Sequence, residues 1–288
     1  MQVADKWMDY RVIATGDGYK LEDWKGVKLL RPDPQVIWPS SIDMGAYKGL
    51  NAKYSRSATG GGAWQVLKPY PEEWTVSYGE LKFLIKPMGF KHTGLFPEQA
   101  VNWDKMSELI CGAEREINVL NLFAYTGGAT VACLKAGARV CHVDAAKGMV
   151  ERAGENCRLS GVGEGKVRFI IDDCLKFVKR EIKRGKKYDA IIMDPPSFGR
   201  GPNGETWKIE NELFGLVKTC VGVLSDDPLF FLINSYTTGL QPQVIKNILT
   251  LNLKHLGGTF DAYEVGLPTD EGIVLPCGCS GLWQNVKG

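Results

Sequence analysis

Three aspartates in the second half of the chain each stand at the end of a short apolar run typical of a buried strand. They are Asp144, Asp173 and Asp194. A carboxylate can accept hydrogen bonds from both hydroxyls of a ribose or from the exocyclic amine of a base. An aspartate after a strand is also a common helix N-cap, so each residue alone leaves both interpretations open. Their joint order favours an adenosine site, with ribose at Asp144 and an adenine edge at Asp173 and the backbone N–H of Cys174.

A tight turn precedes these aspartates, in the segment Asn121-Leu-Phe-Ala-Tyr-Thr-Gly-Gly128. Gly127 and Gly128 let the backbone approach a ligand closely, and the helix that follows offers free N–H groups at its start. The segment is not the G-x-G-x-x-G motif that cradles a pyrophosphate, which argues against a dinucleotide. The bulky Phe123 and Tyr125 suit a ligand without phosphates.

A second motif, Asp194-Pro-Pro-Ser-Phe198, follows the fourth strand-like run. Pro195 and Pro196 fix the backbone and supply no N–H, which leaves rigid carbonyls and the Asp194 carboxylate as acceptors for an amino group. Phe198 has the type of side chain that stacks on a flipped-out base. The alternative is that the prolines only end a strand and Phe198 belongs to the core.

The elements around these motifs alternate, which predicts right-handed βαβ units and a parallel sheet covered on both faces. Ligands of such sheets bind at the carboxyl ends of the strands, where the three aspartates fall. The predicted strands are 118–122, 139–143, 167–171, 188–193, 229–233, 259–264 and 273–276, and the predicted helices are 129–136, 147–160, 174–184, 207–224 and 242–253.

The first part of the chain has a different pattern. Residues 1–72 are expected to form a β-rich accessory domain, with strands at 10–14, 27–30 and 35–38 and a glycine-rich loop at 59–63. Residues 73–116 are expected to form a hairpin, with strands at 74–78 and 81–85, and a helix at 98–111 that leads into the catalytic domain at 117–288.

Five segments together resemble the class I S-adenosylmethionine-dependent methyltransferases related to the bacterial 23S ribosomal RNA methyltransferases. The resemblance covers about residues 74–288. The segments are Val119-Leu-Asn-Leu-Phe-Ala-Tyr-Thr-Gly-Gly128 with the strand end at Asp144, Arg152-Ala-Gly-Glu-Asn156, Asp173-Cys174, Asp194-Pro-Pro-Ser-Phe-Gly-Arg-Gly201, and Lys91-His-Thr-Gly-Leu-Phe-Pro-Glu-Gln99.

The resemblance implies a Rossmann-like, seven-stranded doubly wound sheet, S-adenosylmethionine as cofactor and an RNA base as methyl acceptor. It places ribose at Asp144, adenine at Asp173 and Cys174, and the acceptor at Asp194–Phe198, with Phe96 and Gln99 closing over the cofactor. The methionine part of the cofactor is placed on the loop residues Asn121, Phe123, Tyr125, Thr126 and Gly127, and Asp194 is expected to contact the cofactor as well as the acceptor. The first 70 residues do not resemble the RNA-binding module that some relatives carry there.

A nitrogen acceptor is favoured over carbon-5 of a pyrimidine, because carbon-5 must be activated by a cysteine adduct. Some relatives have that cysteine after the fifth strand, where this chain reads Ile233-Asn-Ser-Tyr-Thr-Thr238. Cys277 and Cys279 remain possible nucleophiles from another strand. Two further hypotheses stay open: a methyltransferase acting on a protein or a small molecule, and a nicotinamide-dependent oxidoreductase.

Composition limits the other functions. The 288 residues carry a net charge of +2, which by itself does not indicate a nucleic-acid-binding protein. Neither a signal peptide nor a membrane-spanning apolar run is seen, and eight mostly apolar-flanked cysteines fit a reducing compartment, so a cytoplasmic enzyme without a metal site is expected. Ribosomal RNA is the expected partner, and the oligomeric state is open. The basic run 179–187 either contacts phosphates or is a solvated helix end.

Overall fold

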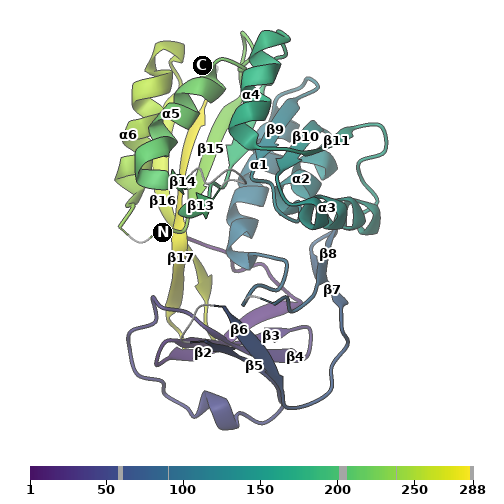
Figure 1. The fold of residues 1–288 in the computed structure, drawn as a ribbon, viewed down its shortest axis with the longest axis vertical. Coiled ribbons are helices and arrows are strands. Elements are labelled where there is room, and N and C mark those ends of the chain that lie inside the picture. Colours follow the sequence, from purple (N-terminus) through teal and green to yellow (C-terminus); the bar gives the residue numbers. More distant parts are fainter. Residues whose placement is uncertain (58–60, 90, 201–205, 238, 286–288) are drawn as a thin grey trace. The chain divides into compact units, whose positions relative to one another are not determined.

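The computed structural model describes residues 1–57, 61–89, 91–200, 206–237 and 239–285 (Figure 1). Contacts divide the chain into two compact units. The first, called the methyltransferase unit below, holds residue 1, 101–265 and 278–288, and the second, called the N-terminal unit, holds 2–100 and 266–277. The division differs from the domain boundaries expected from sequence, because residues 101–116 group with the methyltransferase unit and residues 266–277 with the N-terminal unit.

The methyltransferase unit is built on one sheet, whose strand order is β1-β16-β17-β15-β12-β9-β10-β11. Strands β9–β12 and β15 pair with one another in parallel, and β17 runs antiparallel to β15. The seven expected strands are all present, and the two-residue β1 adds an eighth at the edge. Their bounds are β1 Gln2–Val3, β9 Asn118–Leu122, β10 Arg139–Asp144, β11 Val167–Ile171, β12 Ala190–Met193, β15 Phe230–Ser235, β16 Thr259–Pro268 and β17 Val274–Gln284.

Helices cover both faces of this sheet (Figure 1). On one face α4, α5 and α6 bury apolar side chains against alternate residues of the strands, such as Leu120 and Leu122 of β9. The other face is covered by α1, α2 and α3. The bounds are α1 Ala100–Gly112, α2 Gly128–Lys135, α3 Lys147–Leu159, α4 Cys174–Lys183, α5 Ile209–Val221, α6 Pro242–Leu253 and the 3-10 turn η3 Lys254–Leu256. The predicted Rossmann-like fold is therefore confirmed.

The N-terminal unit contains a five-stranded sheet of order β2-β3-β4-β5-β6 and the separate hairpin β7-β8. Only the β4–β5 pair of the five-stranded sheet is parallel. Small apolar side chains such as Ile13, Leu21 and Leu30 form its core. The bounds are β2 Tyr10–Gly16, β3 Tyr19–Trp24, β4 Val27–Pro32, β5 Leu50–Arg56, β6 Gly62–Val66, β7 Trp74–Tyr78 and β8 Leu81–Ile85, with 3-10 turns η1 Met44–Ala46 and η2 Pro97–Gln99.

One local prediction was wrong, and one predicted helix begins later than expected. The expected strand at 35–38 is a turn and loop, because Val36 N–H closes a turn onto the Asp33 carbonyl and prolines stand on both sides of the segment. The helix expected from 207 begins at Ile209, because residues 206–208 form strand β14 (Thr206–Lys208), which pairs with β13 (Phe198–Arg200). The glycine-rich loop expected at 59–63 lies partly outside the described residues.

Within the part of the chain that the structure describes, no helix has both the length and the apolar character needed to cross a bilayer.

Candidate active site

The predicted site segments meet where the chain reverses its direction across the sheet. From β9 the chain passes through β10 to β11 on one side, and then returns to β12 on the other side of β9. Leu122, the last residue of β9, lies beside Val143 of β10 and Met193 of β12. The Asp194 N–H approaches the Leu122 carbonyl at 3.4 Å. The loop after β9 and the Asp-Pro-Pro motif after β12 therefore flank the switch point at which open α/β sheets bind ligands.

The loop Phe123–Gly127 has an unusual backbone. Phe123 and Tyr125 have φ of 53° and 50°, and Gly127 has φ of 82°. The left-handed region costs a non-glycine residue on the order of 1–3 kcal/mol, and residues held in it are enriched at functional sites. No sequence signal predicted this backbone at Phe123 or Tyr125.

Hydrogen bonds from neighbouring strand ends hold this loop in place. Phe123 N–H donates to Cys174 Sγ at 3.2 Å, and Tyr125 N–H donates to Asp144 Oδ2 at 2.9 Å. Asn156 of α3 donates from Nδ2 to the Thr126 carbonyl at 2.8 Å. The buried Thr126 and its neighbours therefore depend on contacts from β10, α3 and α4.

A buried chain of polar side chains lies beneath the loop. Asn121 Nδ2 donates to Thr130 Oγ1 at 3.0 Å, and the Thr130 hydroxyl lies 2.9 Å from His142 Nδ1. His142 also has a backbone hydrogen bond with Tyr125 that favours its protonated form, but burial dominates and lowers the pKa of His142 to about 4. The imidazole is thus neutral at pH 7. Asn121 was predicted to contact the cofactor, and the structure shows its side-chain amide donating inward to Thr130.

The aspartates at the strand ends combine structural contacts with free acceptor capacity. Asp144 is half-buried, and its second oxygen, Oδ1, accepts from Ala146 N–H at 2.8 Å. Asp173 is exposed and caps α4 by accepting from Lys176 N–H at 2.8 Å. A carboxylate oxygen has two lone pairs, so each side chain can still accept from a ligand. For Asp173 the helix-cap interpretation is therefore confirmed, and an adenine contact is compatible with it.

Cys174 is the first residue of α4 and is buried. Burial raises the pKa of its thiol to about 12, so the sulfur is a neutral packing and hydrogen-bonding group. The backbone N–H groups of the first helical turn have no intrahelical acceptor. Cys174 N–H is one of them, which suits the predicted contact with a ring nitrogen.

The Asp194–Phe198 segment is held by residues that sequence reasoning missed. Trp207 Nε1 donates to the Pro196 carbonyl at 2.6 Å, and its ring centroid lies 6.0 Å from that of Phe123. The hydroxyl of Ser197, which follows β12, forms a hydrogen bond with the hydroxyl of Thr237, which follows β15, at an Oγ–Oγ1 distance of 2.6 Å. Trp207 thus connects the Asp-Pro-Pro motif to the loop after β9. It was expected to begin a helix, and nothing in the local pattern marked it as a site residue.

The side chains of this segment differ in exposure. Asp194 is half-buried, Pro195 is buried and Pro196 is exposed. Phe198 lies on the short β13–β14 ribbon and is 52% exposed. The alternative that Phe198 is a core residue is therefore wrong.

Comparison with known proteins agrees with this geometry. A family model described as S-adenosylmethionine-dependent methyltransferase matches residues 37–218. This chain belongs to that family. A solved S-adenosylmethionine-dependent methyltransferase from Agrobacterium tumefaciens is 31% identical, with a TM-score of 0.92, and the match covers 98% of this chain and 92% of that one. The protein is accordingly an enzyme that uses S-adenosylmethionine.

Curated relatives match a shorter part of this methyltransferase. Ribosomal RNA large subunit methyltransferase K/L of Shewanella frigidimarina is 35% identical over 150 residues, which are 50% of this chain and 20% of that protein. Ribosomal RNA large subunit methyltransferase I of Klebsiella pneumoniae is 34% identical over 119 residues, which are 41% of this chain and 29% of that protein. The chain thus matches less than a third of the length of these relatives.

The chemistry of the site suits the cofactor of the methyltransferase family. S-adenosylmethionine supplies an electrophilic methyl group on a sulfonium, and it carries no phosphate. The loop from Phe123 to Gly127 contains no basic side chain, whereas carboxylates end the neighbouring strands at Asp144, Asp173 and Asp194. Acidic groups around a cationic ligand favour its binding. These residues would hold the adenosine and orient the methionine part, as proposed from sequence.

Phe96 and Gln99 belong to the N-terminal unit. Gln99 is buried in the turn η2, and its N–H donates to the Phe96 carbonyl at 3.1 Å. The Phe96 ring packs edge-on against His92 at a centroid distance of 5.6 Å. Their closing over the cofactor stays a prediction.

Both cysteines of the Cys277-Gly-Cys279 segment are buried. Cys279 lies opposite Ser235 at the end of β15, and its thiol donates to the Leu240 carbonyl at 3.3 Å. Burial raises the pKa of Cys279 to about 11 and that of Cys277 well above its usual range. Because the thiolate is the nucleophile, the raised pKa values disfavour nucleophilic attack by either thiol near neutral pH.

Gly127 is the position of the loop at which an added side chain should weaken cofactor binding most. A Cβ atom there would lie 2.9 Å from Ala153 Cβ, and the φ of 82° is unfavourable for any L-residue. We expect Gly127→Ala to weaken S-adenosylhomocysteine binding at least tenfold, since strain and overpacking each cost about 1–3 kcal/mol. Titration calorimetry would measure this. Gly215→Ala, in an open position of helix α5, is the control and should bind like the wild type; equal affinity in both variants would contradict the prediction.

The neutral, buried His142 should make stability depend on pH. Between pH 6.5 and 4 the unfolded chain protonates this histidine while the folded chain does not, so stability should fall as pH is lowered through that window. The full effect is on the order of 3 kcal/mol for a shift of this size. His92 in the N-terminal unit, whose pKa burial also lowers to about 4, adds a similar contribution. Urea unfolding at several pH values should show a smaller slope for His142→Gln, and an unchanged slope would refute the assignment.

Proposed function

We propose that this methyltransferase modifies a nitrogen of a base in ribosomal RNA. The observation that carries the proposal is the half-exposed Phe198, which ends the Asp194-Pro-Pro-Ser-Phe198 segment and lies on the short β13–β14 ribbon. An exposed aromatic ring beside a carboxylate and rigid carbonyls suits a base that is stacked on one face and held by its amino group. Two similar proteins are named as ribosomal RNA large subunit methyltransferases, which supports RNA as the acceptor class.

In the proposed mechanism the protein chiefly positions the acceptor. Methyl transfer from a sulfonium is an in-line displacement, so the orientation of the acceptor lone pair is a large part of catalysis. Asp194 accepts a hydrogen bond from the base amino group and stabilises the positive charge that develops on the nitrogen as the new bond forms. Phe198 stacks on the ring, and Pro195 and Pro196 keep the backbone carbonyls fixed. The proton of the methylated nitrogen then passes to Asp194 or to water.

The protonated state of the two candidate thiols supports nitrogen over carbon-5. A carbon-5 acceptor needs a thiolate to form the adduct, and Cys277 and Cys279 both have raised pKa values. The same proposal implies that the enzyme acts in the cytoplasm, because the enzyme would encounter its partner, ribosomal RNA, there.

A labelling experiment tests the proposal. Purified protein with radiolabelled S-adenosylmethionine is given unmodified ribosomal RNA, transfer RNA or a cell-protein fraction, and the labelled nucleosides are identified by mass spectrometry. We expect label in ribosomal RNA, on an N-methylated nucleoside. Label on 5-methylcytidine or 5-methyluridine would replace nitrogen by carbon, and label on protein alone would overturn RNA as the substrate. Stabilisation by NAD and not by S-adenosylhomocysteine would point to the oxidoreductase hypothesis instead.

A further inference from the structure

Helix α4 has one apolar face and one basic face. Cys174, Phe177, Val178 and Glu181 are buried against the sheet. The opposite side carries exposed basic residues at spacings of three and four, which place them on one face of a helix. They are Lys176, Lys179, Arg180 and Lys183, followed by Arg184, Lys186 and Lys187 after the helix, and we call them the α4 basic face.

Few acidic groups neutralise this face. Arg180 pairs with Asp172, and Arg184 pairs with Glu181 at 3.0 Å. Glu181 is buried and also accepts from the Tyr188 hydroxyl at 2.6 Å. Among the residues that the structure describes, Lys176, Lys179 and Lys183 form no ion pair. The unpaired cations of such a surface repel one another, and the surface attracts polyanions.

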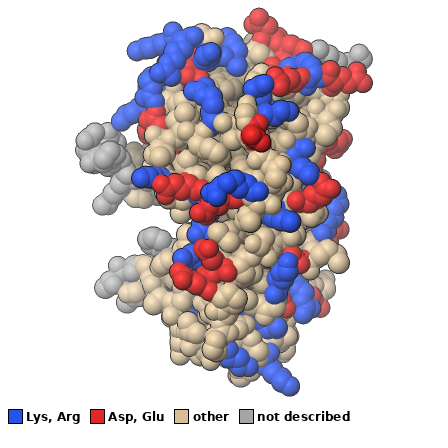
Figure 2. All heavy atoms as spheres, turned by 90° about the vertical axis from the view of Figure 1, so that its right-hand side faces the viewer, with Lys and Arg blue, Asp and Glu red and all other residues tan. Residues whose placement is uncertain are grey.

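The basic charge is local and does not come from the composition of the chain. The net charge of the whole protein is only +2. Figure 2 shows Lys and Arg side chains grouped at the upper left of the drawn face, at the height at which α4 ends in Figure 1. The basic face starts three residues after Asp173 at the strand ends, and Lys176 to Lys183 spans on the order of 10 Å along the helix. The Lys176 end of the face therefore lies near the predicted adenine contact at Asp173, and β11 is the third strand from β12, which the acceptor motif follows.

We propose that the α4 basic face binds the phosphate backbone of the RNA that carries the methylated base. This inference rests on the proposed function. Lysines on a rigid helix position a phosphate backbone without reading its sequence, and the exposed Phe198 and the Asp194-Pro-Pro motif recognise the base. The first 70 residues do not resemble the RNA-binding module of some relatives. The α4 basic face would therefore provide RNA binding that this segment was not predicted to provide.

Charge reversal tests the inference. Lys179→Glu/Lys183→Glu is compared with Lys218→Glu/Lys254→Glu, a control with the same change of charge at exposed positions of α5 and η3. We expect the α4 variant to raise KM for RNA at least tenfold, and to reduce the salt dependence of KM by roughly 0.7 per lost phosphate contact. The kcat at saturating RNA and the Kd for S-adenosylhomocysteine should stay within twofold of wild type. The control should leave all four quantities unchanged.

A second variant separates charge from folding. Glutamates near the end of a helix oppose its dipole, so Lys179→Gln/Lys183→Gln removes the charge without that penalty and should give a smaller shift in the same direction. Wild-type KM and salt dependence in both α4 variants would overturn the inference while leaving the proposed function intact. If the wild-type enzyme labels no RNA at all, the proposed function fails first and this inference falls with it.

Discussion

Replacing Asp194 with alanine is expected to lower kcat for RNA methylation by about 10²–10³-fold, the usual loss when one group that stabilises developing charge is removed. Asp194 follows β12 directly at the switch point of the sheet, beside the loop after β9. In the proposed mechanism its carboxylate stabilises the charge on the acceptor nitrogen. Asp194→Asn keeps an acceptor oxygen but loses the charge, so its kcat should fall between those of the wild type and the alanine variant.

The readouts distinguish a catalytic effect from a structural one. Single-turnover labelling gives the rate of the chemical step, and calorimetry gives the Kd for S-adenosylhomocysteine. This Kd should change little, because Asp144, Asp173 and the loop remain and because S-adenosylhomocysteine lacks the sulfonium charge that the Asp194 carboxylate would attract. Asp226→Ala, at an exposed position of the same unit, is the control and should behave like the wild type. A normal chemical rate in Asp194→Ala would remove Asp194 from the mechanism.

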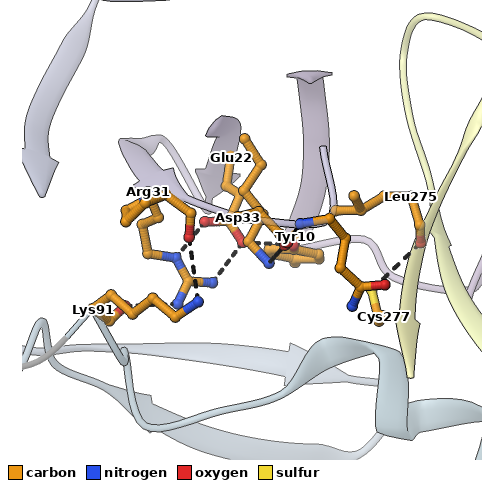
Figure 3. A network of polar contacts seen from close by, with 10 residues as sticks. Tyr10, Glu22, Arg31, Asp33, Lys91, Leu275 and Cys277 are labelled. Atoms are coloured by element: carbon orange, nitrogen blue, oxygen red, sulfur yellow. Dashed lines mark hydrogen bonds and ion pairs between the residues drawn. The ribbon is translucent and has the colours of Figure 1, made fainter. Parts of the chain in front are cut away.

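Replacing Glu22 with glutamine is expected to destabilise the N-terminal unit by about 3–5 kcal/mol, because it leaves a buried cation without its partner. Glu22 is fully buried on β3. Its carboxylate accepts from Arg31 Nε at 2.5 Å and Nη2 at 2.7 Å, and from the Tyr10 hydroxyl at 2.8 Å (Figure 3). The charge of Arg31 keeps the pKa of Glu22 below its usual value despite burial. The centroid of the Trp24 ring lies 5.6 Å from the Arg31 guanidinium carbon, so the fluorescence of Trp24 is sensitive to changes in this region.

Urea unfolding followed by tryptophan fluorescence measures this effect. The double variant Glu22→Leu/Arg31→Met removes both charges and should recover part of the lost stability, since neither charge is then left unpaired. Glu72→Gln is the control, because the Glu72–Lys86 pair is exposed and should contribute no measurable stability. Equal stability of Glu22→Gln and wild type would show that the pair does not hold this unit together.

The amino-acid sequence by itself determined the parallel sheet and the order of the site motifs. Alternating strand and helix patterns identified β9–β12 and the helices between them, since these elements are set by local hydrophobic periodicity. The hairpin β7–β8 was predicted for the same reason, from two β-type runs around Gly79-Glu80. Family resemblance then assigned the cofactor, because the motif order Asn121–Gly128, Asp144, Asp173 and Asp194 is contained in the sequence.

The remaining features were decided by tertiary contacts. Strands β3, β5 and β6 were not predicted, because their pairing depends on partners elsewhere in the sheet and not on a strong local pattern. Phe123 and Tyr125 take positive φ because Cys174 and Asp144, from other strand ends, hold their N–H groups. Long-range packing also brought Trp207 to the Asp-Pro-Pro motif. No local propensity encodes such contacts, so the position of the loop after β9 could be predicted from sequence but its shape could not.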